Sequence, residues 1–155
     1  MKLYLVQHAE ARPKEEDSKQ GLTNKGLVDI KKVADFVARR ARLRVAVIYH
    51  SGKNRARETA EALADYLHPV KGVREGDCLT PMDEPDFWVK RAQELKDDTM
   101  LVGHLPHLAK LASALLTGNE ESNVVTFKNA GIVCLSREEE NRWSLCWAVT
   151  PDILE

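Results

Sequence analysis

Apolar residues form two kinds of pattern along this chain. Short runs that are almost continuously apolar predict strands, and they occupy residues 2–6, 45–49 and 100–102. Between these runs, two segments place apolar residues at steps of three and four, which predicts helices that each bury one stripe. The first two thirds of the chain are therefore expected to alternate between strands and helices.

The first helix is expected to have Thr23 or Asn24 as its cap and to run to about Arg42. Its predicted buried stripe consists of Leu27, Ile30, Ala34, Val37 and Ala41. The second helix is expected to have Ser51 as its cap and to end before Pro69. Its predicted buried residues are Ala56, Ala60, Leu63 and Leu67. Further elements are predicted as a short strand near Val73 and as helices near residues 87–95 and from Pro106 to Gly118.

The last third of the chain changes character. Residues 124–127, 132–135 and 143–149 are predicted strands, and the polar residues 137–142 are predicted to connect the last two as a hairpin. Strand–helix alternation followed by paired strands is typical of an α/β domain with a mainly parallel sheet and an antiparallel portion. No repeat, low-complexity tract or linker interrupts the sequence, so we expect one domain over residues 1–155.

Charge and apolar content limit the partners that we expect. The 155 residues include 23 basic and 24 acidic ones, with a formal net charge of −1, whereas nucleic-acid binding usually needs a basic excess. No apolar run has the length of a membrane span or of a signal-peptide core. We therefore expect neither a nucleic acid nor a membrane as partner.

The chain has three cysteines without Cys-x-x-Cys spacing: Cys78, Cys134 and Cys146. Because Cys134 and Cys146 alternate with apolar neighbours in predicted strands, we expect both to be buried free thiols. Together with the lack of a signal-peptide pattern, this cysteine usage predicts a cytoplasmic protein.

Polar segments follow three of the predicted strands. They are residues 7–11, which include His8, residues 50–57, which include Arg55, and residues 103–107, which include His104. The carboxyl ends of parallel strands meet at one edge of a sheet, and ligands bind there. We therefore expect the two histidines and the arginine to share a crevice.

Residues 50–57 indicate an anion site. Lys53, Arg55 and Arg57 are predicted to lie in the first turn of a helix, whose positive end disfavours cations by about 0.3–1 kcal/mol. Free backbone N–H groups point out of the same end, so cations gathered there make sense if an anion such as phosphate binds. The alternative is a solvated helix face on which Arg57 pairs with Glu61.

Each histidine also has a plainer explanation. A histidine at a strand end is more often a surface or structural residue than a catalyst, and imidazoles are common zinc ligands. No cysteine joins His8 and His104, however, and His104 and His107 lie across a helix start rather than at i and i+4 on one face. We therefore expect no metal site.

In the order and spacing of these segments, the chain resembles the histidine phosphatase superfamily, and most closely its small bacterial phosphohistidine phosphatases of the SixA type. The resemblance runs over nearly the whole length. It rests on the His8 motif, Leu22-Thr23-x-x-Gly26, Ser51-x-x-x-Arg55-Ala56-x-x-Thr59, Leu79-Thr80-Pro81 and Gly103-His104-x-Pro106. It implies a single three-layer α/β/α domain with a mixed, mainly parallel sheet and a phosphoglycerate-mutase-like fold.

The resemblance also implies a role for each matching residue. His8 would attack phosphorus and carry a phosphohistidine intermediate. Arg55 would bind phosphate oxygens through its planar guanidinium group, and His104 would stabilise charge in the transition state. A neutral imidazole, with an ordinary pKa of about 6.5, suits the nucleophile. Neither a metal nor an organic cofactor would be required.

Two departures from the family pattern affect phosphate binding. The superfamily opens with Arg-His-Gly, whereas this chain has Gln7-His8-Ala9, so Gln7 offers phosphate only a neutral amide. The usual Ser-Pro of the second motif is Ser51-Gly52, beside an extra cation at Lys53. We expect Ser51 and Lys53 to contact phosphate, and Lys53 to replace part of the lost charge.

A third departure concerns the proton donor. Larger relatives carry a dedicated carboxylic acid for the leaving group, and the candidates here are Asp83, Glu84 and Asp86. A phosphoramidate such as phosphohistidine departs readily once its imidazole is protonated, so it needs less help than an alkoxide. No insertion is long enough to form a lid, and an open site can admit a phosphate carried by a protein.

We therefore expect a phosphatase that hydrolyses phosphohistidine on proteins, with a histidine phosphotransfer domain as one candidate partner. The first alternative is a phosphatase for small phosphoesters or phosphorylated metabolites. The second is a phosphate- or phosphoprotein-binding module in which Gln7 marks weakened catalysis.

Overall fold

The computed structural model describes residues 1–154, which contain one mixed sheet. Its strands are β1 (Lys2–Gln7), β2 (Val47–His50), β3 (Val73–Glu75), β4 (Thr99–Gly103), β5 (Ile132–Arg137) and β6 (Trp143–Val149). Their order across the sheet is β3-β2-β4-β1-β5-β6. β1 to β4 pair with one another in parallel, and β5 is antiparallel to both β1 and β6. The predicted mixed, mainly parallel sheet is confirmed.

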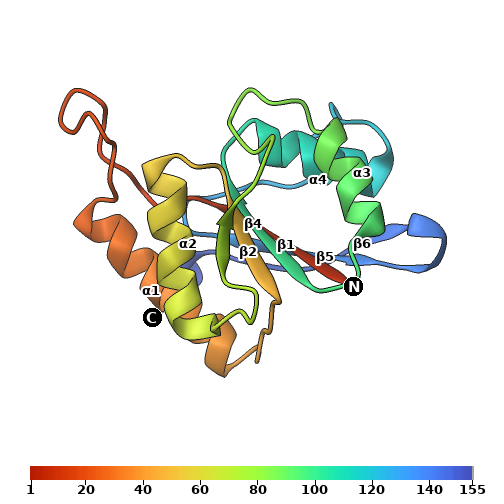
Figure 1. The fold of residues 1–155 in the computed structure, drawn as a ribbon, viewed down its shortest axis with the longest axis horizontal. Helices are drawn as coiled ribbons and strands as arrows, with labels where there is room; N and C mark the ends of the chain where they lie inside the picture. Colours follow the sequence, from red (N-terminus) through yellow and green to blue (C-terminus); the bar gives the residue numbers. More distant parts are fainter. Residues whose placement is uncertain (155) are drawn as a thin grey trace.

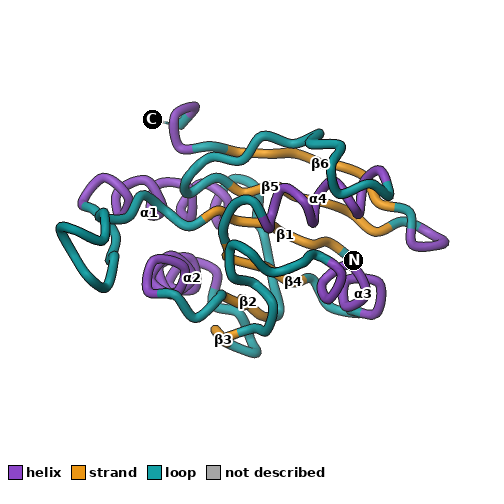
Figure 2. The backbone as a smooth tube through the Cα atoms, turned by 90° about the horizontal axis from the view of Figure 1, so that it is seen from above, coloured by secondary structure: helices purple, strands orange, loops and turns teal. Residues whose placement is uncertain are grey.

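Helices cover both faces of the sheet (Figure 1). One face carries α1 (Asn24–Arg39) and α2 (Asn54–Leu67), and the other carries α3 (Asp86–Glu94) and α4 (His107–Thr117). Figure 2 shows the two pairs on opposite sides of the strands. Two short 3-10 turns, η1 (Glu139–Asn141) and η2 (Pro151–Ile153), follow β5 and β6. The predicted three-layer architecture is confirmed.

The sheet separates two apolar cores. Along β1, Tyr4 and Val6 pack toward α1 and α2, whereas Leu3 and Leu5 pack toward α3 and α4. A strand buried on both faces explains why its sequence is almost continuously apolar. Each fully buried side chain of this size contributes about 1.5–3 kcal/mol relative to an exposed one. The strand that leads to His8 is therefore firmly held at the centre of the domain.

The first helix is shorter than predicted. Thr23 caps α1 as expected, because its hydroxyl accepts a hydrogen bond from the N–H of Gly26 at 2.9 Å. The helix ends at Arg39 rather than near Arg42, so Ala41 lies beyond it. Leu27 is 39% exposed, and both residues were wrongly placed in the buried stripe. The buried residues of α1 are Gly26, Ile30, Val33, Ala34 and Val37.

Three further predictions were wrong. Residues 124–127 form no strand, because Val125 and Phe127 bury their side chains in the core beside α4 without pairing to the sheet. Ser51 does not cap α2, whose N-cap is Lys53. Cys134 is buried as expected, but Cys146 is exposed on β6.

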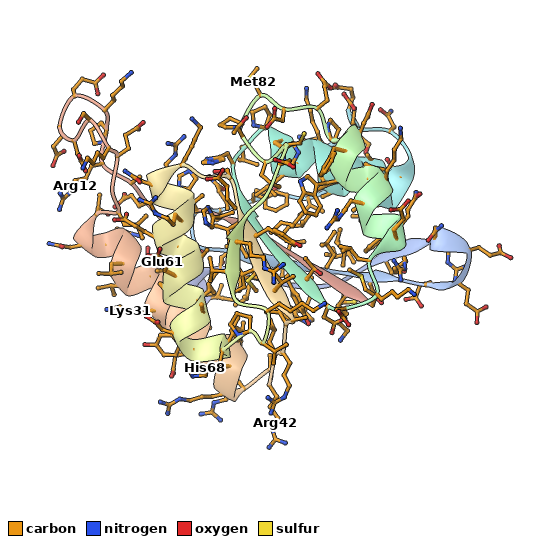
Figure 3. The ribbon with its side chains drawn as sticks, in the orientation of Figure 1. Arg12, Lys31, Arg42, Glu61, His68 and Met82 are labelled. Carbon is orange, nitrogen blue, oxygen red and sulfur yellow. The ribbon has the colours of Figure 1, made fainter. Side chains whose placement is uncertain are left out.

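Two surface features complete the description of the fold. The loop between β1 and α1 projects from the body of the domain, and Figure 3 labels Arg12 on it. A β-bridge between Ala11 and Leu22 joins the base of this loop. No helix within residues 1–154 is both long and apolar enough to cross a membrane.

Candidate active site

The three polar segments converge at one edge of the sheet. β2, β4 and β1 are adjacent and parallel, so the residues that follow them lie side by side. The backbone N–H of His8 donates to the carbonyl oxygen of Gly103 at 3.1 Å. The rings of His8 and His104 have their centroids 5.0 Å apart. As expected, two histidines from distant parts of the chain therefore lie side by side at this edge of the sheet.

The ring of His8 is oriented by its own backbone. Its Nδ1 atom lies 2.7 Å from the carbonyl oxygen of Ala9, and a carbonyl oxygen only accepts hydrogen bonds. Nδ1 must therefore carry the proton, which leaves the Nε2 lone pair of the neutral ring free. Burial lowers the pKa of His8, and the charge of Arg55 lowers it further, whereas the bond to Ala9 raises it. His8 is thus held as a neutral imidazole with one unprotonated nitrogen.

A distant loop also holds the backbone of His8. The side-chain amide of Asn129 donates to the carbonyl oxygen of His8 at 2.9 Å, and the N–H of Ala130 donates to the carbonyl oxygen of Gln7 at 3.0 Å. On the other side, the N–H of Ala9 donates to the hydroxyl of Thr59 at 3.0 Å. The segment that carries His8 is therefore fixed from α2 and from the loop that precedes β5.

Gly26, in the first turn of α1, lies against the segment that follows His8. A Cβ atom at this position would overlap the backbone carbonyl of Glu10, two residues after His8. The first turn of α1 therefore packs directly on the chain that leaves the site. The hydroxyl of Thr23 also donates to the Glu10 carboxylate at 2.6 Å, which ties the helix cap to the same segment.

His104 is almost fully buried, with 2% of its surface exposed. Its Nε2 atom lies 2.7 Å from the hydroxyl oxygen of Ser51. Burial lowers the pKa of His104 to about 3, with further lowering by the neighbouring His8 and by the charges of Arg55 and Lys53. Its Nδ1 atom is buried and has no hydrogen-bond partner within residues 1–154. His104 is therefore neutral at cellular pH, and Ser51 fixes its ring.

Arg55 supplies positive charge that acts on both histidines. It is the second residue of α2, and burial lowers its pKa. It forms no ion pair within the described residues 1–154. The N–H groups of a first helical turn also lack partners inside the helix. An unpaired guanidinium group beside such N–H groups provides an anion-binding position.

The other two cations of this segment differ in surroundings. Lys53 is exposed, and its charge contributes to lowering the pKa of His104. Arg57 is bonded to Asn54 and lies 4.0 Å from Glu61. The solvated-face interpretation therefore fits Arg57, whereas the charge of Lys53 acts on His104.

Gln7 ends β1 on the face that also carries Leu3 and Leu5. Its side-chain oxygen is buried and has no hydrogen-bond partner within residues 1–154. A buried amide without its partner costs stability. The chain therefore carries an unsatisfied neutral group where the family pattern has a cation.

The candidate proton donors lie on the loop before α3 and at its start. Asp83 accepts hydrogen bonds from the hydroxyl and the N–H of Thr80, at 2.6 and 2.8 Å, and these bonds lower its pKa. Glu84 and Asp86 are exposed, and Asp86 is the first residue of α3. Figure 3 shows neighbouring Met82 on the same outer loop. Asp83 is thus held as a carboxylate that braces its own loop.

Sequence reasoning missed the role of Asn129, because a loop asparagine has no periodic pattern and lies 121 residues from its partner. Thr59 was part of a recognised motif, but its bond to Ala9 depends on the packing of α2. Within residues 1–154, no group of three or more histidine, cysteine or carboxylate side chains is arranged to hold a metal ion.

Comparison with known proteins gives a family and a fold. Residues 3–83 match the family described as the histidine phosphatase superfamily (branch 1). No curated protein matches the sequence. The chain is similar in structure to the protein histidine phosphatase SixA complexed with tungstate, with 21% identity, a TM-score of 0.87 and 99% of both chains covered.

Two other solved structures share this fold. The alpha-ribazole phosphatase from Shigella flexneri has 13% identity and a TM-score of 0.76, with 97% of both chains covered. A mycobacterial glucosyl-3-phosphoglycerate phosphatase has 17% identity and a TM-score of 0.70, with 94% of this chain and 98% of that chain covered. At these identities the similarity concerns the fold, which therefore occurs in proteins named for different phosphorylated substrates.

Proposed function

Because this chain belongs to the histidine phosphatase superfamily, we propose that it is a phosphatase that hydrolyses phosphohistidine on proteins through a covalent intermediate on His8. The observation that carries the proposal is the bond from Nδ1 of His8 to the carbonyl of Ala9 at 2.7 Å. This bond leaves Nε2 as the nucleophilic atom, beside the charge of Arg55 and the ring of His104. Similarity in fold to SixA over the whole chain supports the same substrate class.

In the first step, Nε2 of His8 forms a bond to phosphorus while the bond from phosphorus to the substrate nitrogen breaks. Splitting the transfer in two avoids direct attack of water on the substrate. The substrate imidazole leaves as a neutral ring if it has been protonated before the bond breaks. In the second step, water attacks phosphorus, and the products are inorganic phosphate and neutral His8.

The charges at the crevice offset those of the phosphoryl group. Arg55 binds two oxygens through its planar fork, and the N–H groups at the start of α2 contact a third. Ser51, Lys53 and the amide of Gln7 complete the phosphate contacts, and His104 donates its ring N–H to the group in transfer. Loss of one donor that stabilises the transition state, the role proposed for His104, costs about 10²–10³ in rate in comparable sites.

The state of Asp83 favours phosphohistidine over a phosphoester. A general acid must be protonated near neutral pH, but the bonds from Thr80 hold the pKa of Asp83 below its usual range. A phosphoester needs a proton donor for its alkoxide, whereas a protonated phosphohistidine does not. Glu84 and Asp86 remain candidate donors, and they are the residues on which a small-phosphoester activity would depend.

No insertion in the sequence is long enough to form a lid, which also fits a protein substrate such as a histidine phosphotransfer domain. We propose that residues 1–155 act as one phosphatase domain without a metal or organic cofactor. A cytoplasmic location fits the three free cysteines. The alternative of a weakened binding module rests on Gln7 alone, since His8, Arg55 and His104 are all present at the site.

The proposal is tested by turnover of two substrates. The full chain would be incubated with a phosphohistidine-bearing phosphotransfer domain and with an aryl phosphate, and radiolabelled enzyme would be trapped by rapid denaturation at alkaline pH. We expect faster turnover of the phosphoprotein and an alkali-stable, acid-labile label on His8. Preference for the aryl phosphate would support the small-phosphoester alternative, and binding without turnover would support the binding module.

Two variants assign the label. His8→Ala should abolish both labelling and turnover. His68→Asn is the matched control, because His68 lies at the far end of α2 (Figure 3), and asparagine tolerates its left-handed backbone. Retention of near-normal turnover in His8→Ala would rule out the proposed nucleophile.

A further inference from the structure

Two cysteines face each other where β5 and β6 lose their register. Cys134 is opposite Trp147, whereas Leu135 is opposite Leu145, so Cys146 is an extra residue in β6. In such a bulge, two residues of one strand oppose a single residue of the other. Cys146 and Trp147 therefore share Cys134 as their neighbour across the strands.

The two thiols are neighbours at the bulge but differ in access to solvent. Cys134 is fully buried beside Tyr4, on the face that packs toward α1 and α2, whereas Cys146 is exposed on the outermost strand. Burial is the main cause that raises the pKa of Cys134 to about 12, and Cys146 raises it further. Cys134 is therefore the weaker nucleophile and the one that solvent does not reach.

We propose that Cys134 and Cys146 form a reversible disulfide when the protein meets a peroxide. The Cys146 thiolate attacks the peroxide, forms a sulfur–oxygen bond and releases water or an alcohol, which gives a sulfenic acid. Cys134 gives up its proton as its sulfur bonds to the Cys146 sulfur, the sulfur–oxygen bond breaks, and the hydroxyl group takes the proton and leaves as water. Two electrons pass from the two thiols to the peroxide, and a dithiol reductant returns them.

The geometry favours this pair over any pair that includes Cys78. Trp147 is directly opposite Cys134, and Cys146 is the next residue in the bulge, so the two cysteines are neighbours across the strands. Cys78 is exposed on the loop that follows β3, at the opposite edge of the sheet from β6. The exposed Cys146 reacts first, and the buried Cys134 beside it resolves the product. The two residues together form a complete redox site.

Tryptic peptide mapping tests the proposal directly. Trypsin cleaves after Lys128, Arg137 and Arg142, so Cys134 and Cys146 fall in separate peptides, 129–137 and 143–155. The reduced full chain would be treated with one equivalent of hydrogen peroxide, alkylated and digested without reductant. We expect the two peptides to appear as one linked species, about 2 Da lighter than their sum, and to separate after dithiothreitol.

Three variants sharpen the result. The linked species should persist in Cys78→Ser and disappear in Cys146→Ser, an exposed change that leaves the core intact. In Cys134→Ser, the sulfenic acid on Cys146 should accumulate and react with dimedone, because its resolving thiol is gone. Sulfinic acid on Cys146 in the wild-type chain without a linked species, or a link that involves Cys78, would overturn the proposal. None of these readouts depends on phosphatase activity.

Discussion

The hydroxyl oxygen of Ser51 lies 2.7 Å from Nε2 of His104, and this contact joins the end of β2 to the residue that follows β4. His104 is neutral and buried, so the serine is the group that sets its ring orientation. The contact also explains why Ser51 does not cap α2, because the hydroxyl oxygen of Ser51 is engaged with His104. The same oxygen accepts a longer hydrogen bond, of 3.3 Å, from the backbone N–H of Lys53, which is the N-cap residue.

We expect Ser51→Ala to lower kcat more than it raises KM. The variant removes the partner of a buried nitrogen, which costs about 1–3 kcal/mol, and a loss near the lower end is about tenfold in rate. Ser51→Thr keeps the hydroxyl and should recover most of the activity. A wild-type kcat in Ser51→Ala would mean that the ring of His104 needs no orientation by residue 51.

The second prediction concerns compensation between Lys53 and Gln7. Lys53→Ala should reduce kcat/KM by roughly ten- to a hundredfold, the effect of losing a charge-assisted hydrogen bond of about 1.5–3 kcal/mol. Gln7→Arg should restore part of that loss in the double variant. The two single variants and the double variant form a cycle that isolates the coupling between the positions.

Strictly additive effects in this cycle would show that the two residues do not share a phosphate. An unchanged rate in Lys53→Ala would make the lysine an ordinary surface residue. Arg57→Ala is the matched control, because Arg57 is engaged with Asn54 and Glu61 and should leave kcat/KM nearly unchanged.

Gly26→Ala should displace the segment that carries His8. The added Cβ atom would overlap the carbonyl of Glu10, and overpacking of this kind costs about 1–3 kcal/mol. We expect a lower midpoint in urea unfolding together with a loss of kcat. Gly21→Ala is the control, since its new atom would meet only the carboxylate ends of Asp17 and Glu58, which can move. Equal behaviour of the two variants would contradict the proposed contact.

Protein stability should fall as the pH drops below about 6.5. Burial is the main cause that lowers the pKa of His8, His50, His104 and His107. The unfolded chain, with histidine pKa values near 6.5, therefore binds more protons than the folded one below that pH. The histidine contribution to stability is complete above pH 6.5. This contribution is lost as the pH falls from 6.5 toward the lower pKa values of the folded state. The loss is up to about 1.4 kcal/mol per pH unit for each histidine.

Urea unfolding at pH 7.5, 6.5 and 5.5 measures this dependence. His107→Leu should flatten it, because the ring of His107 is fully buried and neither nitrogen has a partner within residues 1–154. His68→Asn, at an exposed position, should leave the slope unchanged. A stability that is constant between pH 7.5 and 5.5 would contradict the lowered pKa values.

The last prediction concerns metals. Extended treatment with a chelator should leave kcat/KM unchanged, because side chains and helix N–H groups supply the proposed charge stabilisation. Loss of activity that a divalent ion restores would instead indicate a metal-dependent mechanism.

The sequence predicted the meeting of three strand ends because that result needs only parallel strands and the residues that follow them. Arg55 and the two histidines could be found in this way. The contact between Asn129 and His8 could not, since it depends on where an irregular segment returns to the sheet. Residues 124–127 show the same limit: an apolar pattern reports burial, and here burial occurs without strand pairing. The exposure of Cys146 follows from a bulge that no pattern of apolar residues reveals.

The position of β1 in the sheet has a consequence for the order in which the protein assembles. β1 precedes both of its neighbours in the chain, since β4 begins at Thr99 and β5 at Ile132. During synthesis on a ribosome, the apolar residues of β1 therefore have no neighbouring strand to pair with until most of the chain has emerged. The Asn129 contact to His8 also forms late, for the same reason. The proposed site around His8 is therefore complete only after residues 129 and 130 have been synthesised and have packed against the end of β1.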